Sequence, residues 1–223
     1  EAVEYAVPGF APTGTVYECT FIIHIANPGL RVEMCSDRSG ATDIDLHLHR
    51  PGTTTDWFSN TDDCYYSNCK AGSTAAPNWG YANSPLAECV GGPEGSQWQT
   101  LGYCRNPRLD IDSISNNGVP ENINVDVPGN GESFRVMAHY YSGTGVVHPL
   151  VNVYCGGTLR ATYGGPGNQL TNFDSSGSSA GDMWRVVDAQ MMVVGGVTVD
   201  CTLTPLHPPG EMTGYWVNNV RTY

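Results

Sequence analysis

The amino-acid sequence predicts an all-β protein, an antiparallel β-sandwich of the jelly-roll or immunoglobulin-like type. Short runs rich in Val, Ile, Thr and Tyr recur between clusters of Gly, Pro, Asn and Asp, whereas helical periodicity is almost absent. The 27 glycines and 15 prolines supply turn residues between these runs. Eight cysteines, an even number, indicate disulfide bonds that replace helical bulk.

The strand pattern is clearest at residues 43–49. Strict alternation there directs Ile44, Leu46 and Leu48 to one face and the polar residues between them to the other. Residues 134–141 and 150–155 have the apolar content of central strands. The expected strands cover residues 16–26, 30–35, 43–49, 108–112, 122–127, 133–141, 150–155, 158–163, 183–194 and 197–204.

These strands predict one domain over residues 16–204, preceded by an N-terminal arm (1–15). Residues 51–107 lack clear strands and form a long, aromatic, cysteine-rich insertion, which we expect to be ordered by disulfides. Residues 205–223 consist of a Pro- and Gly-rich hinge followed by a strand-like run, YWVNNVRTY. This last strand can complete its own sheet or pair with a neighbouring molecule, and the sequence leaves both open.

The cysteines favour an oxidising, extracellular location, because no paired CxxC motif of a zinc ribbon is present and the chain has a single lysine. Eight cysteines allow 105 pairings. Local spacing favours two short loop clips, one hairpin bridge and one long-range clamp. The expected pairs are Cys64–Cys69, Cys89–Cys104, Cys19–Cys35 and Cys155–Cys201.

The charge balance excludes several classes of partner. With 10 basic and 22 acidic residues the formal net charge is −12, and no basic run is present, so binding to nucleic acid or to an anionic membrane is not expected. No apolar stretch approaches the roughly 18 residues that a membrane span requires.

Acidic residues concentrate on two of the expected strands. Alternation places Asp43, Asp45 and His47 on one face of the first strand, and Asp110 and Asp112 on one face of the second. If these strands are neighbours, four carboxylates converge with no lysine nearby. Such a cluster repels itself unless a cation binds. The alternative is that both faces are simply solvated.

The ion expected at these carboxylates is Ca²⁺, because hard oxygen ligands in an extracellular module suit it. Glu121 and Asn122, which follow an Asn-Asn-Gly turn, add a carboxylate and a carbonyl to the expected set. The loop DIDSISNNG lacks the spacing of an EF-hand.

Four motifs in order, DIDLHLHRP, NPRLDID, GVPENINVDVP and FRVMAHYYSG, resemble a bacterial extracytoplasmic β-sandwich module. They are similar to YfaP-like domains and to modules of large secreted proteins of myxobacteria, over roughly residues 31–155. The resemblance implies a calcium-stabilised, non-catalytic surface module. It implies as site residues Asp43, Asp45, Asp110, Asp112 and Glu121.

Three functions follow as hypotheses. The first is a non-catalytic structural protein of the cell surface that self-assembles into a fibre or layer through its terminal strands. The second is a module that binds surface polysaccharide by stacking sugar rings on Trp57, Trp79 and Trp98. The third is a zinc-dependent hydrolase in which His47 and His49, two residues apart on one strand face, bind zinc with His139 or His148. We expect no enzyme activity, because no HExxH motif is present and Ser, His and Asp residues are scattered without a recognisable catalytic context.

Overall fold

The computed structural model describes residues 28–37, 42–70, 73, 77–81, 107–114, 119–174 and 182–223. These residues form strands and no helix, and none of their segments is therefore a helix that could cross a membrane. The strands are β1 (Leu30–Ser36), β2 (Asp43–His49), β3 (Asp63–Cys64), β4 (Arg108–Leu109), β5 (Glu121–Val125), β6 (Ser133–Ser142), β7 (Pro149–Cys155), β8 (Thr158–Tyr163), β9 (Met183–Val194), β10 (Val197–Pro205) and β11 (Trp216–Asn218).

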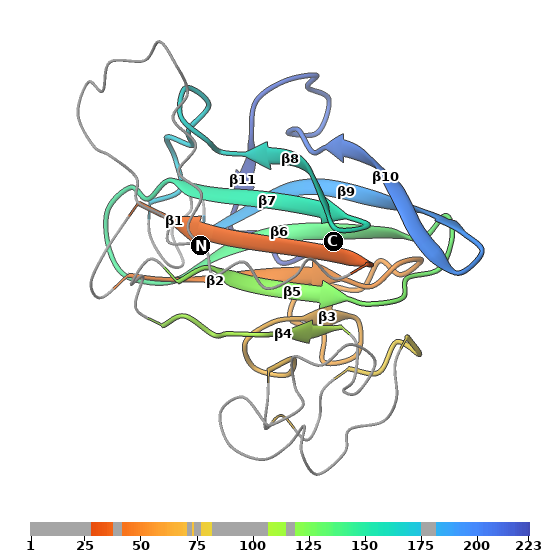
Figure 1. The fold of residues 1–223 in the computed structure, drawn as a ribbon. Coiled ribbons are helices and arrows are strands. Elements are labelled where there is room, and N and C mark those ends of the chain that lie inside the picture. The colour runs from red at the N-terminus through yellow and green to blue at the C-terminus, as the bar shows by residue number, and fades with distance from the viewer. Residues whose placement is uncertain are drawn as a thin grey trace.

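Two antiparallel sheets pack face to face, so the predicted all-β sandwich is confirmed (Figure 1). The five-stranded sheet has the order β4-β5-β1-β7-β8, and the six-stranded sheet has the order β10-β9-β6-β2-β3, with β11 pairing β9 beside β10. Leu30 and Val32 of β1 meet Leu46 of β2 and Val136 of β6 in one continuous core. Alternation along each strand explains which side chains enter this core.

The expected strand positions agree closely with the observed ones. β2, β8 and β9 have the predicted bounds, and β4 is shorter than expected, because it ends at Leu109. β3 was not expected: it lies inside the 51–107 insertion, which was predicted to lack strands. The expected strand at residues 16–26 and the arm at 1–15 lie outside the described residues.

Two hairpins use Gly-Gly turns, one between β7 and β8 and one between β9 and β10. Both glycines of each turn have positive φ, which two-residue hairpins of this kind require. Gly156 has a second constraint, because a Cβ there would lie 2.5 Å from the carbonyl oxygen of Thr198 on β10. This close approach brings β7 of one sheet against β10 of the other.

Two disulfide bonds are described, and one of them joins β7 to β10. Cys155 on β7 is bonded to Cys201 on β10, and Cys64 is bonded to Cys69, which confirms two of the predicted pairs. Cys35 is also disulfide-bonded. Its predicted partner Cys19, and the predicted pair Cys89–Cys104, lie outside the described residues. The disulfides are those of a protein from an oxidising environment.

Candidate functional site

The polar residues of β2 lie on the face of the six-stranded sheet that is turned away from the core. Leu46 and Leu48 point into the core, so alternation sends Asp45 and His47 to the opposite side. That side is not solvated: Asp45 is 1% exposed and His47 is fully buried. The alternative of a simple solvated face is therefore wrong for β2.

The segment that follows β2 covers this face with aromatic rings. Trp57 is 3% exposed, and the ring of Tyr65 stacks on His47 with 4.9 Å between centroids. Phe58 has a φ of 67°, a conformation that a bulky residue rarely adopts. Its backbone N–H donates to Asp63 Oδ2 at 2.7 Å, which holds this strained turn in place.

The C-terminal residues close the same face. The Arg221 guanidinium lies over the Phe58 ring at 4.7 Å and donates to Asp182 Oδ2 at 2.9 Å. The backbone carbonyl of Arg221 also accepts from Trp57 N–H at 2.8 Å. Residues from two distant parts of the chain thus seal the polar face of β2.

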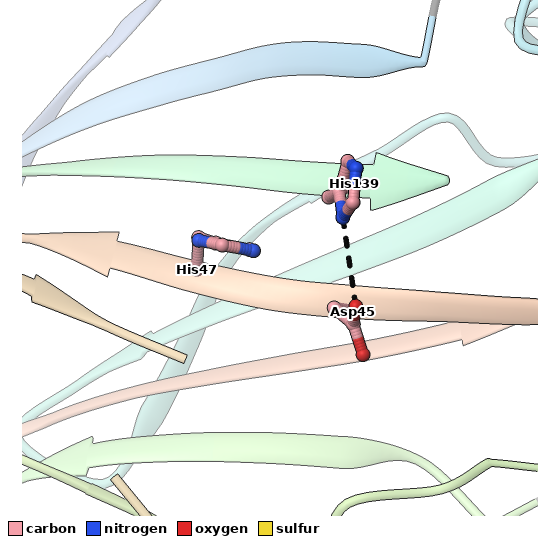
Figure 2. Close-up of side chains that lie close together, drawn as sticks. All are labelled: Asp45, His47 and His139. Carbon is pink, nitrogen blue, oxygen red and sulfur yellow. Dashed lines mark ion pairs between the residues drawn. The ribbon is translucent and has the colours of Figure 1, made fainter. Parts of the chain in front are cut away.

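Asp45, His47 and His139 meet beneath this cover. The β2–β6 register places His139 directly opposite Asp45, with His47 two residues farther along β2. One ligand atom from each residue lies within 4.8 Å of the others. Figure 2 shows a ring nitrogen of His47 pointing toward the space between Asp45 and His139.

Neighbouring groups fix the tautomer of His47 and the charge of His139. His47 Nδ1 lies 2.8 Å from Asp63 Oδ2, which also accepts from a backbone N–H, so the proton of this contact belongs to Nδ1. In the tautomer with its proton on Nδ1, Nε2 carries a free lone pair. Burial, together with the nearby charges of His47 and Arg221, lowers the pKa of His139 to about 3, so His139 is neutral at pH 7.

Each member of this group has a buried polar atom without a hydrogen-bond partner among the described residues: Asp45 Oδ2, His47 Nε2 and His139 Nδ1. Asp45 Oδ2 and His139 Nδ1 are 3.5 Å apart, which is too far for a hydrogen bond of normal strength. An unsatisfied buried polar atom costs about 1–3 kcal/mol. The arrangement suits a cation better than it suits hydrogen bonding.

A second group shares Asp45. One oxygen each from Asp45, Asp112 and Glu121 lies within 4.8 Å of the others. Glu121 Oε2 accepts from Leu46 N–H at 2.7 Å, and Oε1 accepts from Ser113 N–H at 3.0 Å. The short strand β3 pairs only with Leu48 and His49 of β2. The Glu121 carboxylate accepts a backbone hydrogen bond from β2 beyond the end of that pairing.

Burial perturbs these carboxylates strongly. Burial, together with the charges of Asp45 and Asp112, raises the pKa of Asp43 to about 7. Burial likewise raises the pKa of Asp45 to about 7 and that of Glu121 well above its ordinary value. Of the expected residues, Asp45, Asp112 and Glu121 meet and Asp43 lies near two of them, and their negative charge is costly in this position.

The expectation that no lysine lies nearby was wrong. Lys70 forms an ion pair with Asp112, and its backbone bridges to Leu109. Its charge lowers the pKa values of Asp43 and Asp45, against the larger effect of burial. The insertion that carries Lys70 is remote in sequence from the acidic strands, so no local pattern indicated this contact.

The structure does not bring Asp110, a predicted ligand, together with Asp45, Asp112 and Glu121. Because β4 ends at Leu109, Asp110 and Asp112 do not follow the alternation of one strand. Asp110 instead lies 3.3 Å from Arg108 and 3.6 Å from Arg31, and it accepts from Asn124 Nδ2 at 2.7 Å. It belongs to a separate buried polar network of the five-stranded sheet.

The side chain of Asn122, the other predicted ligand on this segment, also lies outside the acidic group. It precedes the core residue Ile123 and follows Glu121, so its side chain points away from Glu121. Its Nδ2 donates to the carbonyl of Pro120 at 3.2 Å. Asn122 is therefore on the far side of β5 from the acidic group.

Two histidines of the zinc hypothesis lie elsewhere. Both ring nitrogens of His49 lie near backbone carbonyls, Nδ1 3.2 Å from Arg50 O and Nε2 3.0 Å from Thr55 O. His148 Nδ1 is 2.6 Å from Asp37 Oδ2. Of the histidines considered, His47 and His139 are the two that meet.

The tryptophans proposed to stack on sugars are engaged in packing. Trp57 is buried as described above, and Trp79 is 6% exposed, with its Nε1–H donated to Thr61 O at 2.8 Å. Neither ring offers an open face, so the structure does not support these two as glycan contacts. Trp98 lies outside the described residues.

Comparison of the chain with protein-family models, curated proteins and solved structures found no match. The resemblance to YfaP-like modules therefore stays a prediction, and the function is inferred from the geometry of the site.

Proposed function

We propose that this protein is a non-catalytic extracellular structural module whose β-sandwich is stabilised by calcium. The observation that carries the proposal is the meeting of Asp45, Asp112 and Glu121. Asp45 belongs to β2 of the six-stranded sheet, Glu121 begins β5 of the other sheet, and Asp112 follows β4. A cation bound to all three joins the two layers of the sandwich at one edge.

The charge of the group supports a divalent cation with oxygen ligands. Asp43, Asp45, Asp112 and Glu121 bring four carboxylates, and Lys70 supplies one positive charge through Asp112. Ionisation of the remaining carboxylates is opposed by burial and mutual repulsion, and a bound cation removes both penalties. Carboxylate oxygens are the ligands that Ca²⁺ prefers.

Burial also supports a structural role over a catalytic one. The side chains with the most reactive chemistry, Asp45, His47 and His139, are at most 6% exposed and lie beneath Phe58 and Tyr65. A catalytic metal requires an open position for substrate, whereas a structural metal is enclosed by the protein. The disulfides agree with an extracellular location.

Self-assembly is the second part of the proposal. β11 pairs with β9 of its own chain, and the hinge before it contains Pro208, Pro209 and Gly210. Exchange of the segment 206–223 between two copies preserves every contact that this segment makes, so the same pairing can link molecules. The proposed assembly is therefore strand exchange through this hinge.

The calcium claim is tested by thermal unfolding of the metal-free protein with and without calcium chloride. We expect calcium to raise the Tm of the wild type and to have a much smaller effect on Asp112→Asn. Asp200→Asn, at an exposed carboxylate paired with Arg160, is the matched control and keeps the full calcium response. Equal responses of the two variants, or no response of the wild type, contradict the proposal.

The assembly claim is tested by locking the C-terminal strand in its own chain. Met183 and Asn218 are paired residues of β9 and β11, so Met183→Cys with Asn218→Cys allows a disulfide between them. We expect light scattering to show oligomers of the wild type and of each single variant, and monomers of the oxidised double variant. Oligomers that persist in the locked protein contradict strand exchange.

A further inference from the structure

We propose that Asp45, His47 and His139 form a second metal site, specific for a borderline divalent transition metal of the zinc class. The inference goes beyond the calcium-stabilised module, because it concerns nitrogen ligands on the sealed outer face of the six-stranded sheet. It rests on the geometry of two neighbouring strands. The register of β2 and β6 presents two imidazoles and one carboxylate to a common point.

The three proposed ligand atoms are buried and have lone pairs that can bind a metal ion. Asp45 Oδ2, His47 Nε2 and His139 Nδ1 are buried, and none has a hydrogen-bond partner in the part of the chain that the structure describes. His47 donates its Nδ1 proton to Asp63, which leaves the Nε2 lone pair free. The three residues are more than nine-tenths buried, with 1%, 0% and 6% exposure respectively.

Carboxylates lie behind both imidazoles. Asp63 Oδ2 is 2.8 Å from His47 Nδ1, and Asp182 Oδ2 is 3.9 Å from His139 Nε2. Metal-binding histidines generally direct their second nitrogen at a carboxylate or carbonyl, which fixes the ring orientation and strengthens the ligand. A histidine buried only for packing needs no such pair of acidic neighbours at its far side.

The ligand set selects the metal. Two imidazoles and a carboxylate suit zinc and similar first-row ions, whereas calcium prefers oxygen ligands throughout. Because Tyr65, Phe58 and Trp57 surround the His47 ring, the ion serves to tie β2 to β6 and, through Asp63, to the covering segment.

The test is zinc binding to the metal-free protein, measured by dialysis against zinc chloride and elemental analysis. We expect about one zinc ion per chain in the wild type. His47→Gln and His139→Gln each lose this zinc, whereas His148→Gln, at a histidine paired with Asp37 outside the site, retains it. Stoichiometric zinc in both ligand variants, or none in the wild type, overturns the inference.

Two measurements on the wild type keep the test decisive if a ligand variant does not fold. Cobalt(II) substituted into the wild type is expected to give visible d–d bands, and X-ray absorption of the zinc protein is expected to show two imidazole ligands. Asp63→Asn, which keeps an acceptor for the Phe58 N–H, is expected to lower zinc affinity by roughly 10–100-fold. A coordination shell without imidazole contradicts the proposal.

The zinc and calcium claims can fail separately. A calcium response without zinc binding overturns the inference and leaves the proposed function intact. Zinc binding without a calcium response supports the inference and contradicts the calcium claim.

Discussion

Asp45 of β2 and His139 of β6 are directly opposed across the six-stranded sheet, with Asp45 Oδ2 3.5 Å from His139 Nδ1. Both atoms are buried, and neither has a hydrogen-bond partner within the residues that the structure describes. Asp45 is the residue common to the acidic group with Asp112 and Glu121 and to the imidazole group with His47. The pair of strands β2 and β6 therefore carries Asp45, the residue that both proposed metal sites share.

Replacement of Lys70 by methionine is expected to strengthen calcium binding. Lys70 is the cation that the structure already places against Asp112, and its removal relieves the repulsion between ammonium and metal ion. We expect calcium affinity, measured by isothermal titration calorimetry, to increase about tenfold, equivalent to about 1.4 kcal/mol. Arg160→Met, which removes a cation paired with Asp200, is the control. Weaker calcium binding by Lys70→Met than by the control contradicts the proposed site.

Glu121→Gln is expected to destabilise the protein in the absence of metal. Both oxygens of Glu121 accept backbone N–H groups, from Leu46 and Ser113, and the amide nitrogen of glutamine has no lone pair with which to accept either. One buried donor is left unsatisfied, which costs about 1–3 kcal/mol. Urea unfolding measures the loss, with exposed Glu211→Gln as the control. A variant as stable as the control shows that the carboxylate is not needed along β2.

The two described disulfides are expected to contribute unequally to the free energy of unfolding. Cys155–Cys201 spans 46 residues and joins the two sheets, whereas Cys64–Cys69 spans 5 residues. In the chain-entropy model the longer loop contributes about 4 kcal/mol and the shorter one about 2 kcal/mol. Paired Cys→Ser variants, compared by denaturant unfolding, check the order. A larger loss on removal of Cys64–Cys69 contradicts it.

Arg221→Met is expected to loosen the cover over the site. The side chain donates to Asp182 and lies over the Phe58 ring, so its replacement removes a charged hydrogen bond and a cation–π contact. Because Arg221 is partly exposed, we expect a loss of about 1–2 kcal/mol. Hydrogen exchange at Trp57 and Phe58 is expected to accelerate more than exchange in β7. Uniform exchange rates across the domain contradict a local covering role.

Much of the fold was predictable because the strands follow simple rules. Alternation at residues 43–49 and the Gly-Gly turns before Thr158 and Val197 are local signals, and the corresponding strands were placed correctly. β3 is two residues long, and its pairing with β2 depends on how the insertion folds back. A strand that short has no periodicity to detect.

The site was predictable in part, for the same reason. Asp45 and His47 share a face by local alternation, but the position of His139 depends on the β2–β6 register, which two separate strands determine. The pattern of residues 134–141 does place His139 opposite the core residues Ala138 and Tyr140. Asp110 and Asp112 share a face only if the strand continues past Leu109, where β4 ends.

The most direct test of the account is a crystal structure of the calcium-equilibrated protein, with anomalous diffraction measured at a long X-ray wavelength. We expect a calcium peak coordinated by Asp45, Asp112 and Glu121, with Lys70 displaced from its contact with Asp112. An undisturbed Lys70–Asp112 ion pair, with no anomalous peak between these carboxylates at saturating calcium, would contradict it.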